Sequence, residues 1–193
     1  MRKNKTDRPT VEQLEAELKR VQHTSRFRTV LKSTVYTLIT VAAIAVLVVT
    51  LWLPVFQIYG NSMSPTFEPG QIVLTTKTNH LHSGDIVAFY YNNKILVKRY
   101  IAGSGQWVDI DRQGVVSVDG KPIQEPYLDQ LHYGDNTDID FPYQVPDGRL
   151  FVMGDSRQTS MDSRSAAVGC IAEEELVGKI LIRVWPLGKI QVF

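Results

Sequence analysis

The chain has 193 residues, of which 44% are apolar, and this is enough for one well-packed core plus an appendage but too little for two such cores. Its charges are nearly balanced, with a formal net charge of +1, and give no reason to expect a nucleic-acid partner. A single cysteine, Cys170, excludes an intrachain disulfide, and because the four histidines are scattered we predict no metal site and no cofactor.

The first 32 residues are hydrophilic and contain a short helical pattern. Val11, Leu14 and Leu18 are spaced so that they fall on one face of an α-helix. The pattern is too short for a coiled coil, which needs about three or more heptads. We therefore interpret residues 1–32 as a cytoplasmic segment with a short amphipathic helix.

Residues 33–53 read STVYTLITVAAIAVLVVTLWL and contain no charge, and a run of this length can cross the hydrocarbon core of a bilayer. A buried core helix is one alternative, but such a helix usually keeps a polar stripe and this run has none. A cleavable signal peptide is another, but roughly thirty hydrophilic residues precede the run and no small-x-small site follows it. We predict a transmembrane helix over residues 33–54.

The basic residues lie on one side of this run. Arg20, Arg26, Arg28 and Lys32 precede it, whereas the first basic residue after it is Lys77. Because lysine and arginine close to a span are retained in the cytoplasm, the N-terminus should be cytoplasmic. We predict a single-pass protein of the cytoplasmic membrane with an extracytoplasmic domain over residues 55–193.

The rest of the chain alternates between short β-rich runs and turn residues. The runs are 71-QIVLTT, 85-DIVAFYY, 94-KILVKRYIA, 107-WVDID, 114-GVVSVDG, 149-RLFVMG and 179-KILIRVWPL. Gly, Asn, Asp and Pro bound them, as is typical of turns. The best candidate for a helix is short, 172-AEEELVG. We predict a mostly β domain built on an antiparallel sheet, with closure into a barrel-like shape as one way to hide its edges.

Ser62 stands between a glycine and a proline in 60-GNSMSPT-66, directly after the transmembrane run. It is either a turn residue at a domain boundary or a nucleophile placed where a membrane-bound substrate must pass. A serine hydroxyl needs a base, and none of the four histidines stands in a setting that suggests one.

Lys98 is the alternative base. It lies among apolar residues in 94-KILVKRYIA, and Arg99 takes the opposite face of the strand. If Lys98 points inward, burial favours its neutral form. From this strand alone, the reverse arrangement, with Lys98 in water and Arg99 inside, is equally open.

The stretch 154-GDSRQTSMDSR-164 is dense in carboxylates, guanidiniums and hydroxyls, a composition that suits neither a strand nor a helix. Its four charged residues could pair among themselves, and Ser160 could then orient a neighbouring amine. A solvated polar loop is the other open interpretation. The four charged residues are Asp155, Arg157, Asp162 and Arg164.

Four stretches, taken in order behind one membrane anchor, resemble the sequence boxes of bacterial type I signal peptidases, which are membrane-bound Ser/Lys endopeptidases. They are 56-FQIYGNSMSPT-66, 84-GDIVAF-89, 97-VKRYIAG-103 and 154-GDSRQTSMDSR-164. Two further stretches, 119-DGKPIQEPY-127 and 176-LVGKILIRVWP-186, are also similar to segments of that family. The resemblance implies the family's mostly β catalytic domain and hydrolysis of signal peptides after small residues, with secreted preproteins and the lipid bilayer as partners.

The resemblance also implies roles for individual residues. Ser62 matches the nucleophile, Lys98 the general base and Ser160 the serine that hydrogen-bonds this lysine. Asp162 and Arg164 match the supporting pair. The remaining matches are Asp155 and Arg157 at charged positions of the last box, and Ile58, Met63, Leu96 and Val97 in the pockets for small side chains.

Gly60 departs from some members of the family, which carry a hydroxyl residue there that helps to hold the oxyanion. Gly60 has no side chain to donate, so the backbone N–H of Ser62 is the expected donor.

Two other interpretations of the function of this chain remain. A membrane-anchored scaffold would have lost Ser62 or Lys98, and both are present. A self-cleaving repressor of the Ser/Lys type is opposed by the transmembrane run and by the lack of a basic patch for DNA.

Overall fold

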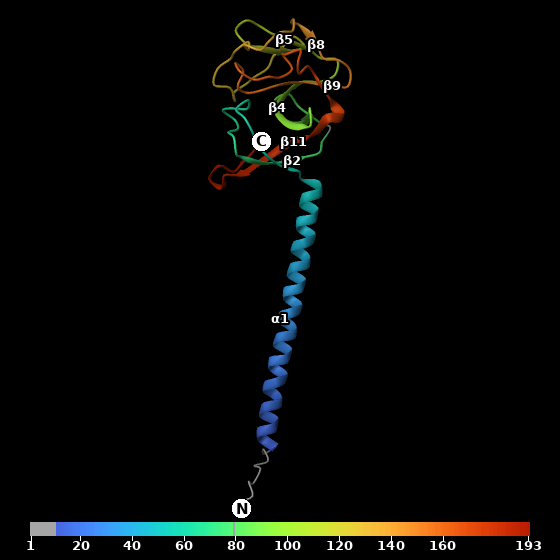
Figure 1. Ribbon diagram of the computed structural model, residues 1–193, viewed down its shortest axis with the longest axis vertical. Helices are drawn as coiled ribbons and strands as arrows, with labels where there is room; N and C mark the ends of the chain where they lie inside the picture. The colour runs from blue at the N-terminus through green and yellow to red at the C-terminus, as the bar shows by residue number, and fades with distance from the viewer. Residues whose placement is uncertain (1–10, 79) are drawn as a thin grey trace, which may run out of the picture. The chain divides into compact units, whose positions relative to one another are not determined.

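A computed structural model describes residues 11–78 and 80–193, whereas residues 1–10 and residue 79 lie outside the described part of the chain (Figure 1). Contacts within the chain divide it into two compact units, Met1–Val49 and Thr50–Phe193. The first unit contains most of one long helix. The second contains every strand of the described chain and is called the β domain below.

The helix α1 (Val11–Trp52) is continuous over 42 residues. The sequence has no glycine or proline within these bounds, and the helix ends just before Pro54, which disfavours helical geometry in the residue that precedes it. The stretch Arg26–Val48 is long and apolar enough to cross a membrane, and none of its most apolar window is buried. The alternative of a buried core helix is therefore wrong.

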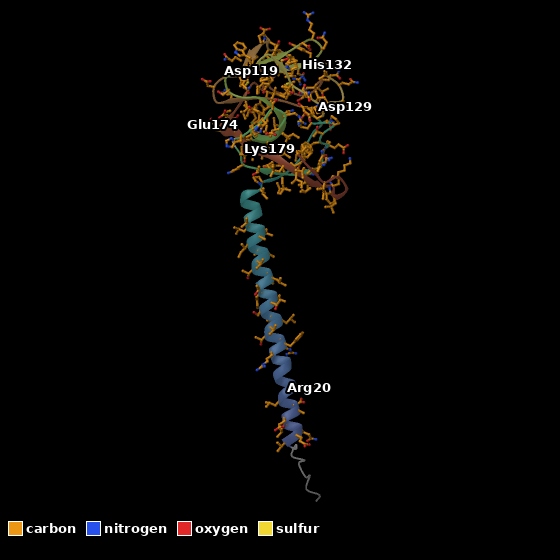
Figure 2. The ribbon with its side chains drawn as sticks, turned by 180° about the vertical axis from the view of Figure 1, so that it is seen from behind. Arg20, Asp119, Asp129, His132, Glu174 and Lys179 are labelled. Carbon is orange, nitrogen blue, oxygen red and sulfur yellow. The ribbon has the colours of Figure 1, made fainter. Side chains whose placement is uncertain are left out.

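The short amphipathic helix and the apolar run predicted from the sequence belong to this one helix. Arg20 lies on the polar N-terminal part of α1, and its side chain is exposed (Figure 2). One of its guanidinium nitrogens lies 3.8 Å from a carboxylate oxygen of Glu17. Such exposed pairs contribute little to stability, so the length of α1 follows from its uninterrupted helix-forming sequence rather than from ion pairs.

The β domain contains two antiparallel sheets. The larger has the spatial order β1 (Val55–Gln57), β2 (Ile72–Thr76), β11 (Leu176–Trp185), β3 (Ile86–Tyr91), β4 (Lys94–Ala102), β9 (Arg149–Met153) and β10 (Ile171–Ala172), with β12 (Gln191–Val192) also paired to β11. The smaller has the order β7 (Lys121–Pro122), β6 (Val116–Val118), β5 (Trp107–Ile110) and β8 (Tyr143–Gln144). Two 3₁₀ turns, Glu173–Glu175 and Leu187–Lys189, flank β11. The predicted mostly antiparallel β fold is confirmed.

The hairpin of β3 and β4 shows how the local sequence sets the register. Tyr91 pairs with Lys94, and the two residues between them, Asn92 and Asn93, have φ of 46° and 60°. A two-residue turn with positive φ at both positions matches the twist of the strands that it joins, and asparagine tolerates this conformation. The register places Val87 opposite Lys98, so the turn determines which face Lys98 occupies.

Buried side chains from both sheets form one core cluster between them. Ile101 and Phe151 come from the larger sheet, and Val108 and Val116 come from the smaller one. Figure 1 shows β5 and β8 at one end of the β domain, β2 and β11 at the other, and β4 and β9 between them. The strands β4 and β9 therefore have packed neighbours on both faces.

One predicted element is wrong, and several were not predicted. The candidate helix at residues 172–178 is only the 3₁₀ turn Glu173–Glu175, and Leu176 already belongs to β11. Leu176 and Gly178 pair with β3, so pairing with a distant strand overrides the local preference. The strands β1, β7, β8, β10 and β12 have only two or three residues each, which is too few for an alternating pattern to show in the sequence.

The core between the sheets leads to a stability prediction. Phe151 is fully buried and its ring packs against those of Phe141 and Tyr143. We expect Phe151→Ala to lower the free energy of unfolding by about 3–5 kcal/mol, because it removes apolar burial and leaves a cavity. Urea unfolding of the detergent-solubilised protein, followed by circular dichroism, measures this. The control, Trp107→Ala, removes a ring that is 47% exposed and should cost much less; equal losses would contradict the assignment of the core.

Candidate active site

A groove of about 700 Å³ runs along the larger sheet and contains Ser62. One side is formed by β1 and the turn that follows it, and the other by the first half of β4. The four residues expected to line pockets all lie in this groove: Ile58, Met63, Leu96 and Val97. The structure thus brings these four side chains together with Ser62.

Ser62 lies in a turn that the core holds in place. Met63 and Phe67 are almost completely buried in one apolar cluster, and the N–H of Phe67 donates to the carbonyl oxygen of Met63 at 2.8 Å. The carbonyl oxygen of Ser62 accepts a hydrogen bond from the N–H of Ser156 at 3.1 Å. Within residues 11–78 and 80–193, no group accepts a hydrogen bond from the Ser62 N–H. The turn therefore presents a half-buried hydroxyl and an unused backbone donor at the groove.

Lys98 points into the protein. Its residue is 4% exposed, and Nζ donates a hydrogen bond to Oγ of Ser160 at 2.9 Å. The interpretation that placed Lys98 in water is wrong. Arg99 takes the opposite face, as expected, but that face is also buried because β4 is covered on both sides.

Burial lowers the pKa of Lys98 from 10.5 to about 8. The negative charge of Asp162 acts in the opposite direction, the positive charge of Arg164 lowers the pKa further, and Asp155 raises it slightly. Loss of hydration is the main cause because a charged ammonium is far better solvated than a neutral amine. With a pKa near 8, roughly a tenth of the molecules carry a neutral Lys98 at pH 7.

Asp162 and Arg164 form a buried ion pair next to this amine. Arg164 donates from Nε to Oδ1 at 2.8 Å and from Nη2 to Oδ2 at 2.9 Å. Burial alone would raise the pKa of Asp162, but hydrogen bonds and charge from Arg164, with hydrogen bonds from the N–H of Gly154 and the hydroxyl of Ser160, keep this pKa below its ordinary value. Ser160 therefore accepts from Lys98 and donates to Asp162, which fixes the direction of its hydroxyl.

One interpretation of the sequence had the four charged residues of 154–164 pair among themselves. Asp155 and Arg157 do not pair in this way. Asp155 accepts from Arg99, with Nε to Oδ1 at 2.8 Å and Nη2 to Oδ2 at 2.5 Å. Arg157 donates from both Nη atoms to the two carboxylate oxygens of Glu125. Pairs with residues on other segments satisfy both charges inside the protein, so the solvated-loop interpretation of 154–164 is also wrong.

Glycine is required at position 154 for space. A Cβ built there would collide with the Ser160 side chain and with the carbonyl oxygen of Ser62. Ser62 and Ser160, which lie 98 positions apart in the sequence, are therefore both packed against Gly154. Because Ser160 also accepts the hydrogen bond from the Lys98 amine, it links this amine to the glycine against which the Ser62 turn packs.

Sequence reasoning gave no role to three residues of this network. In the sequence, Arg99 stands out only as the neighbour of Lys98, and Glu125 and Tyr127 lie in 119-DGKPIQEPY-127, which resembles a family segment but carries no motif of its own. In the structure, Arg99 stacks on the ring of Tyr127 at 3.5 Å, and the Tyr127 hydroxyl donates to Glu125 at 2.8 Å. The proline that follows Glu125 is a local signal for the turn at 126–127.

A serine hydroxyl on an apolar groove can carry out nucleophilic acyl transfer when a base is within reach, and a buried lysine of lowered pKa is a suitable base. The described part of the chain contains no cluster of three or more histidine, cysteine, aspartate or glutamate side chains that could hold a metal ion. The arrangement needs only the groups that are present: a nucleophile, a base, a residue that orients the base and a backbone N–H for an oxyanion.

Comparison with known proteins gives one family. Residues 31–185 match the model of the family described as signal peptidase, peptidase S26. Signal peptidase IB of Staphylococcus aureus is 35% identical over 153 residues, 69% of this chain and 78% of that protein. Signal peptidase I U of Bacillus subtilis is 29% identical over 168 residues, 81% of this chain and 89% of that protein.

Among solved structures, a signal peptidase I from Enterococcus faecalis is similar to this chain. The sequence identity is 27%, the match covers 53% of this chain and 98% of that chain, and the TM-score is 0.44.

The buried amine leads to a prediction about stability and pH. The pKa of Lys98 is 10.5 as an ordinary lysine and about 8 in the folded protein. Between these pH values the unfolded chain holds a proton that the folded chain lacks, so stability should rise with pH across this window, by up to about 3 kcal/mol. Lys98→Met should lack this rise, whereas Lys94→Met, at an exposed position, should keep it.

Melting curves of the three proteins between pH 7 and pH 10.5 measure the effect. Other titrating groups act equally on all three, so only the difference between the curves matters. A wild-type curve parallel to that of Lys98→Met would contradict a lowered pKa at Lys98.

Proposed function

This chain belongs to the signal peptidase family, peptidase S26, and from that premise we propose a Ser/Lys mechanism for its cleavage of signal peptides from preproteins. It is a serine protease of the signal peptidase I type. In the proposal, Ser62 is the nucleophile, neutral Lys98 is the general base and Ser160 orients Lys98. Asp162 and Arg164 support Ser160. The observation that carries the proposal is the buried Lys98 amine on Ser160, at 2.9 Å.

The groove can hold an extended peptide. The backbone of Ile95–Lys98 pairs with β3 on one side, and the described chain has no partner strand for it on the other side until β9 begins to pair at Arg99. A substrate strand added at this free edge would gain main-chain hydrogen bonds and present alternate side chains to the enzyme. The apolar pockets around Ile58, Met63, Leu96 and Val97 suit a requirement for small residues at the first and third positions before the cut.

The direction of the substrate follows from the order of the strands. Four successive antiparallel pairings connect β1 to β4, so these two strands run in the same direction. Both run toward the site: β1 leads into the turn of Ser62, and β4 leads to Lys98. Val55 at the start of β1 and Lys94 at the start of β4 both line the groove. In the proposal, the substrate residues before the cut lie along these two strands and run in the same direction, so that the scissile bond comes to Ser62.

The chemistry then proceeds in two acyl-transfer steps. Lys98 takes the proton of the Ser62 hydroxyl, and the Ser62 oxygen attacks the carbonyl carbon of the scissile bond. As the C–N bond breaks, Lys98 gives this proton to the nitrogen of the departing chain. This leaves the signal peptide as an ester on Ser62. A water that gives a proton to Lys98 then attacks the ester. As the bond to the Ser62 oxygen breaks, Lys98 returns this proton to that oxygen, and the signal peptide leaves with a free carboxylate.

The oxyanion of both steps would lie on the backbone N–H of Ser62, which has no acceptor in the described chain. Gly60 offers no side chain for this purpose. Its φ of 76° and its position on the groove fit a backbone role, in which the chain turns so that the Ser62 amide faces the substrate.

Bacterial signal peptidase I proteins are membrane-anchored, and this chain has one N-terminal apolar helix of sufficient length. In the proposed topology, residues 1–32 are cytoplasmic, residues 33–54 cross the cytoplasmic membrane and residues 55–193 form the extracytoplasmic catalytic domain. The bilayer then supplies proximity, because enzyme and substrate held at one surface meet at a raised effective concentration.

The Ser/Lys mechanism predicts a pH profile. Only neutral Lys98 can accept the proton, so kcat/KM should rise about tenfold per pH unit below the pKa near 8 and level off above it. Ser62→Ala and Lys98→Arg should be equally inactive, because a guanidinium does not lose its proton in this range. The assay is cleavage of a preprotein by the detergent-solubilised enzyme, with the new N-terminus mapped by mass spectrometry. Turnover by a folded Lys98→Arg enzyme would remove Lys98 from the role of base.

The topology has its own test. Protease added outside spheroplasts should digest the domain after residue 54 and spare the segment before Lys32, because the basic residues near the span keep that segment in the cytoplasm. Antibodies against the two ends of the chain report the fragments. Digestion of the domain only after lysis would contradict the proposed orientation and indicate the opposite one.

A further inference from the structure

The stretch 123–128 makes contacts that the mechanism above does not use. It follows β7 of the smaller sheet, yet Glu125 and Tyr127 both contact residues of the larger sheet or of the loop 154–160, which is called the catalytic loop below. These contacts are between charged or aromatic side chains that are mostly buried. They are therefore more specific than simple covering of the core.

The first contact is the ion pair of Glu125 and Arg157, whose side chains are 3% and 1% exposed. The two groups meet through both guanidinium nitrogens and both carboxylate oxygens. Arg157 uses its remaining nitrogen, Nε, to donate to the carbonyl oxygen of Gly154 at 3.1 Å. Glu125 thus orients an arginine that holds the backbone of the catalytic loop at its first residue.

The second contact is the stack of Arg99 on Tyr127, with 3.5 Å between the guanidinium carbon and the ring centroid. The same guanidinium makes the two hydrogen bonds to Asp155. Tyr127 donates its hydroxyl to Glu125. Burial, together with the charge of Glu125, raises the pKa of Tyr127, so the hydroxyl stays protonated and remains a donor.

The two contacts act on neighbouring residues of the catalytic loop. Arg157 holds Gly154, and Arg99 holds Asp155. The next residue, Ser156, donates its N–H to the carbonyl oxygen of Ser62. The position of the Ser62 turn relative to Ser160 therefore depends on how these three loop residues are held.

We propose that Glu125 and Tyr127 are positioning residues, which fix the catalytic loop so that Ser62 and the Lys98–Ser160 pair keep their spacing. The reaction that this spacing serves is the proposed Ser/Lys cleavage. Misplacement of reacting groups by about 1 Å can cost on the order of 100-fold in rate. A buried ion pair is by itself weak evidence of a stabilising role, because apolar residues of similar size often replace such a pair without loss of stability.

This difference allows an experiment on the full-length protein in detergent that separates positioning from stability. Glu125→Leu leaves Arg157 buried without its carboxylate partner and should lower the Tm strongly. The double variant Glu125→Leu with Arg157→Met removes both charges and should recover most of that Tm. Because it also removes the hydrogen bond from Nε to Gly154, its kcat should stay about 100-fold below wild type while KM changes less than about threefold.

A second measurement does not depend on activity. Hydrogen exchange, read by mass spectrometry, should show the Ser156 amide of the double variant exchanging at least about tenfold faster than in wild type, because the catalytic loop is no longer held. The matched control is Val116→Ala, in the core between the sheets. The change removes only side-chain methyl groups and leaves the hydrogen bond from the Ile123 N–H to the Val116 carbonyl oxygen in place. It should lower the Tm, while its kcat and its Ser156 exchange should match wild type.

Tyr127→Leu is the second variant, for the case that the double variant does not fold. It removes the stack on Arg99 and the hydroxyl donor, and should also lower kcat and speed Ser156 exchange. Tyr127→Phe should be intermediate because the ring remains.

Wild-type kcat and wild-type Ser156 exchange in a folded double variant, or in Tyr127→Leu, would overturn the positioning role. A wild-type protein that cuts no preprotein would instead overturn the proposed function, and the exchange measurement would still decide the role of Glu125 and Tyr127.

Discussion

The burial of the Lys98 amine is the constraint on which the rest of the site depends. Lowering its pKa from 10.5 to about 8 corresponds to roughly 3 kcal/mol of bias against the charged form, and loss of water is the main cause. A carboxylate free to approach the amine would cancel this effect. Both nearby carboxylates are bound to arginines, Asp162 to Arg164 and Asp155 to Arg99, so each acts on Lys98 as half of an ion pair.

The strand β4 shows how one element can serve two networks. Alternation along a strand sends Lys98 to one face and Arg99 to the other. On a sheet with one wet face, one of these charges would reach water, but here both faces are covered, and each side chain must find partners inside the protein. Lys98 meets a neutral hydroxyl, whereas the guanidinium of Arg99 meets a carboxylate. The chemistry of the two side chains and their partners, rather than burial alone, separates the two roles.

Much of this arrangement could be predicted from the sequence, and the failures share one cause. The bounds of β4 follow from its β-rich run and its turn residues, and the roles proposed for Ser62 and Lys98 are what the family resemblance implies. Which face of β4 is buried could not be decided locally, because Ser160 lies 62 positions further along the chain. The partners of Asp155 and Arg157 are similarly distant, by 56 and 32 positions. Pairing between near neighbours was the wrong expectation for both, since it ignores which segments fold onto the loop.

Gly154 is the point at which these distant pairings meet. Its N–H donates to Asp162, its carbonyl oxygen accepts from Arg157, and the space that a Cβ would occupy is taken by the Ser160 side chain and the Ser62 carbonyl. One residue is thereby tied to two ion pairs and placed against both serines of the site. Groups joined in one buried network do not contribute independently, because the loss of one partner leaves the others unsatisfied. The Ser62 turn, the Lys98 amine and the two ion pairs therefore form a single unit, whose geometry is set by all of its members together.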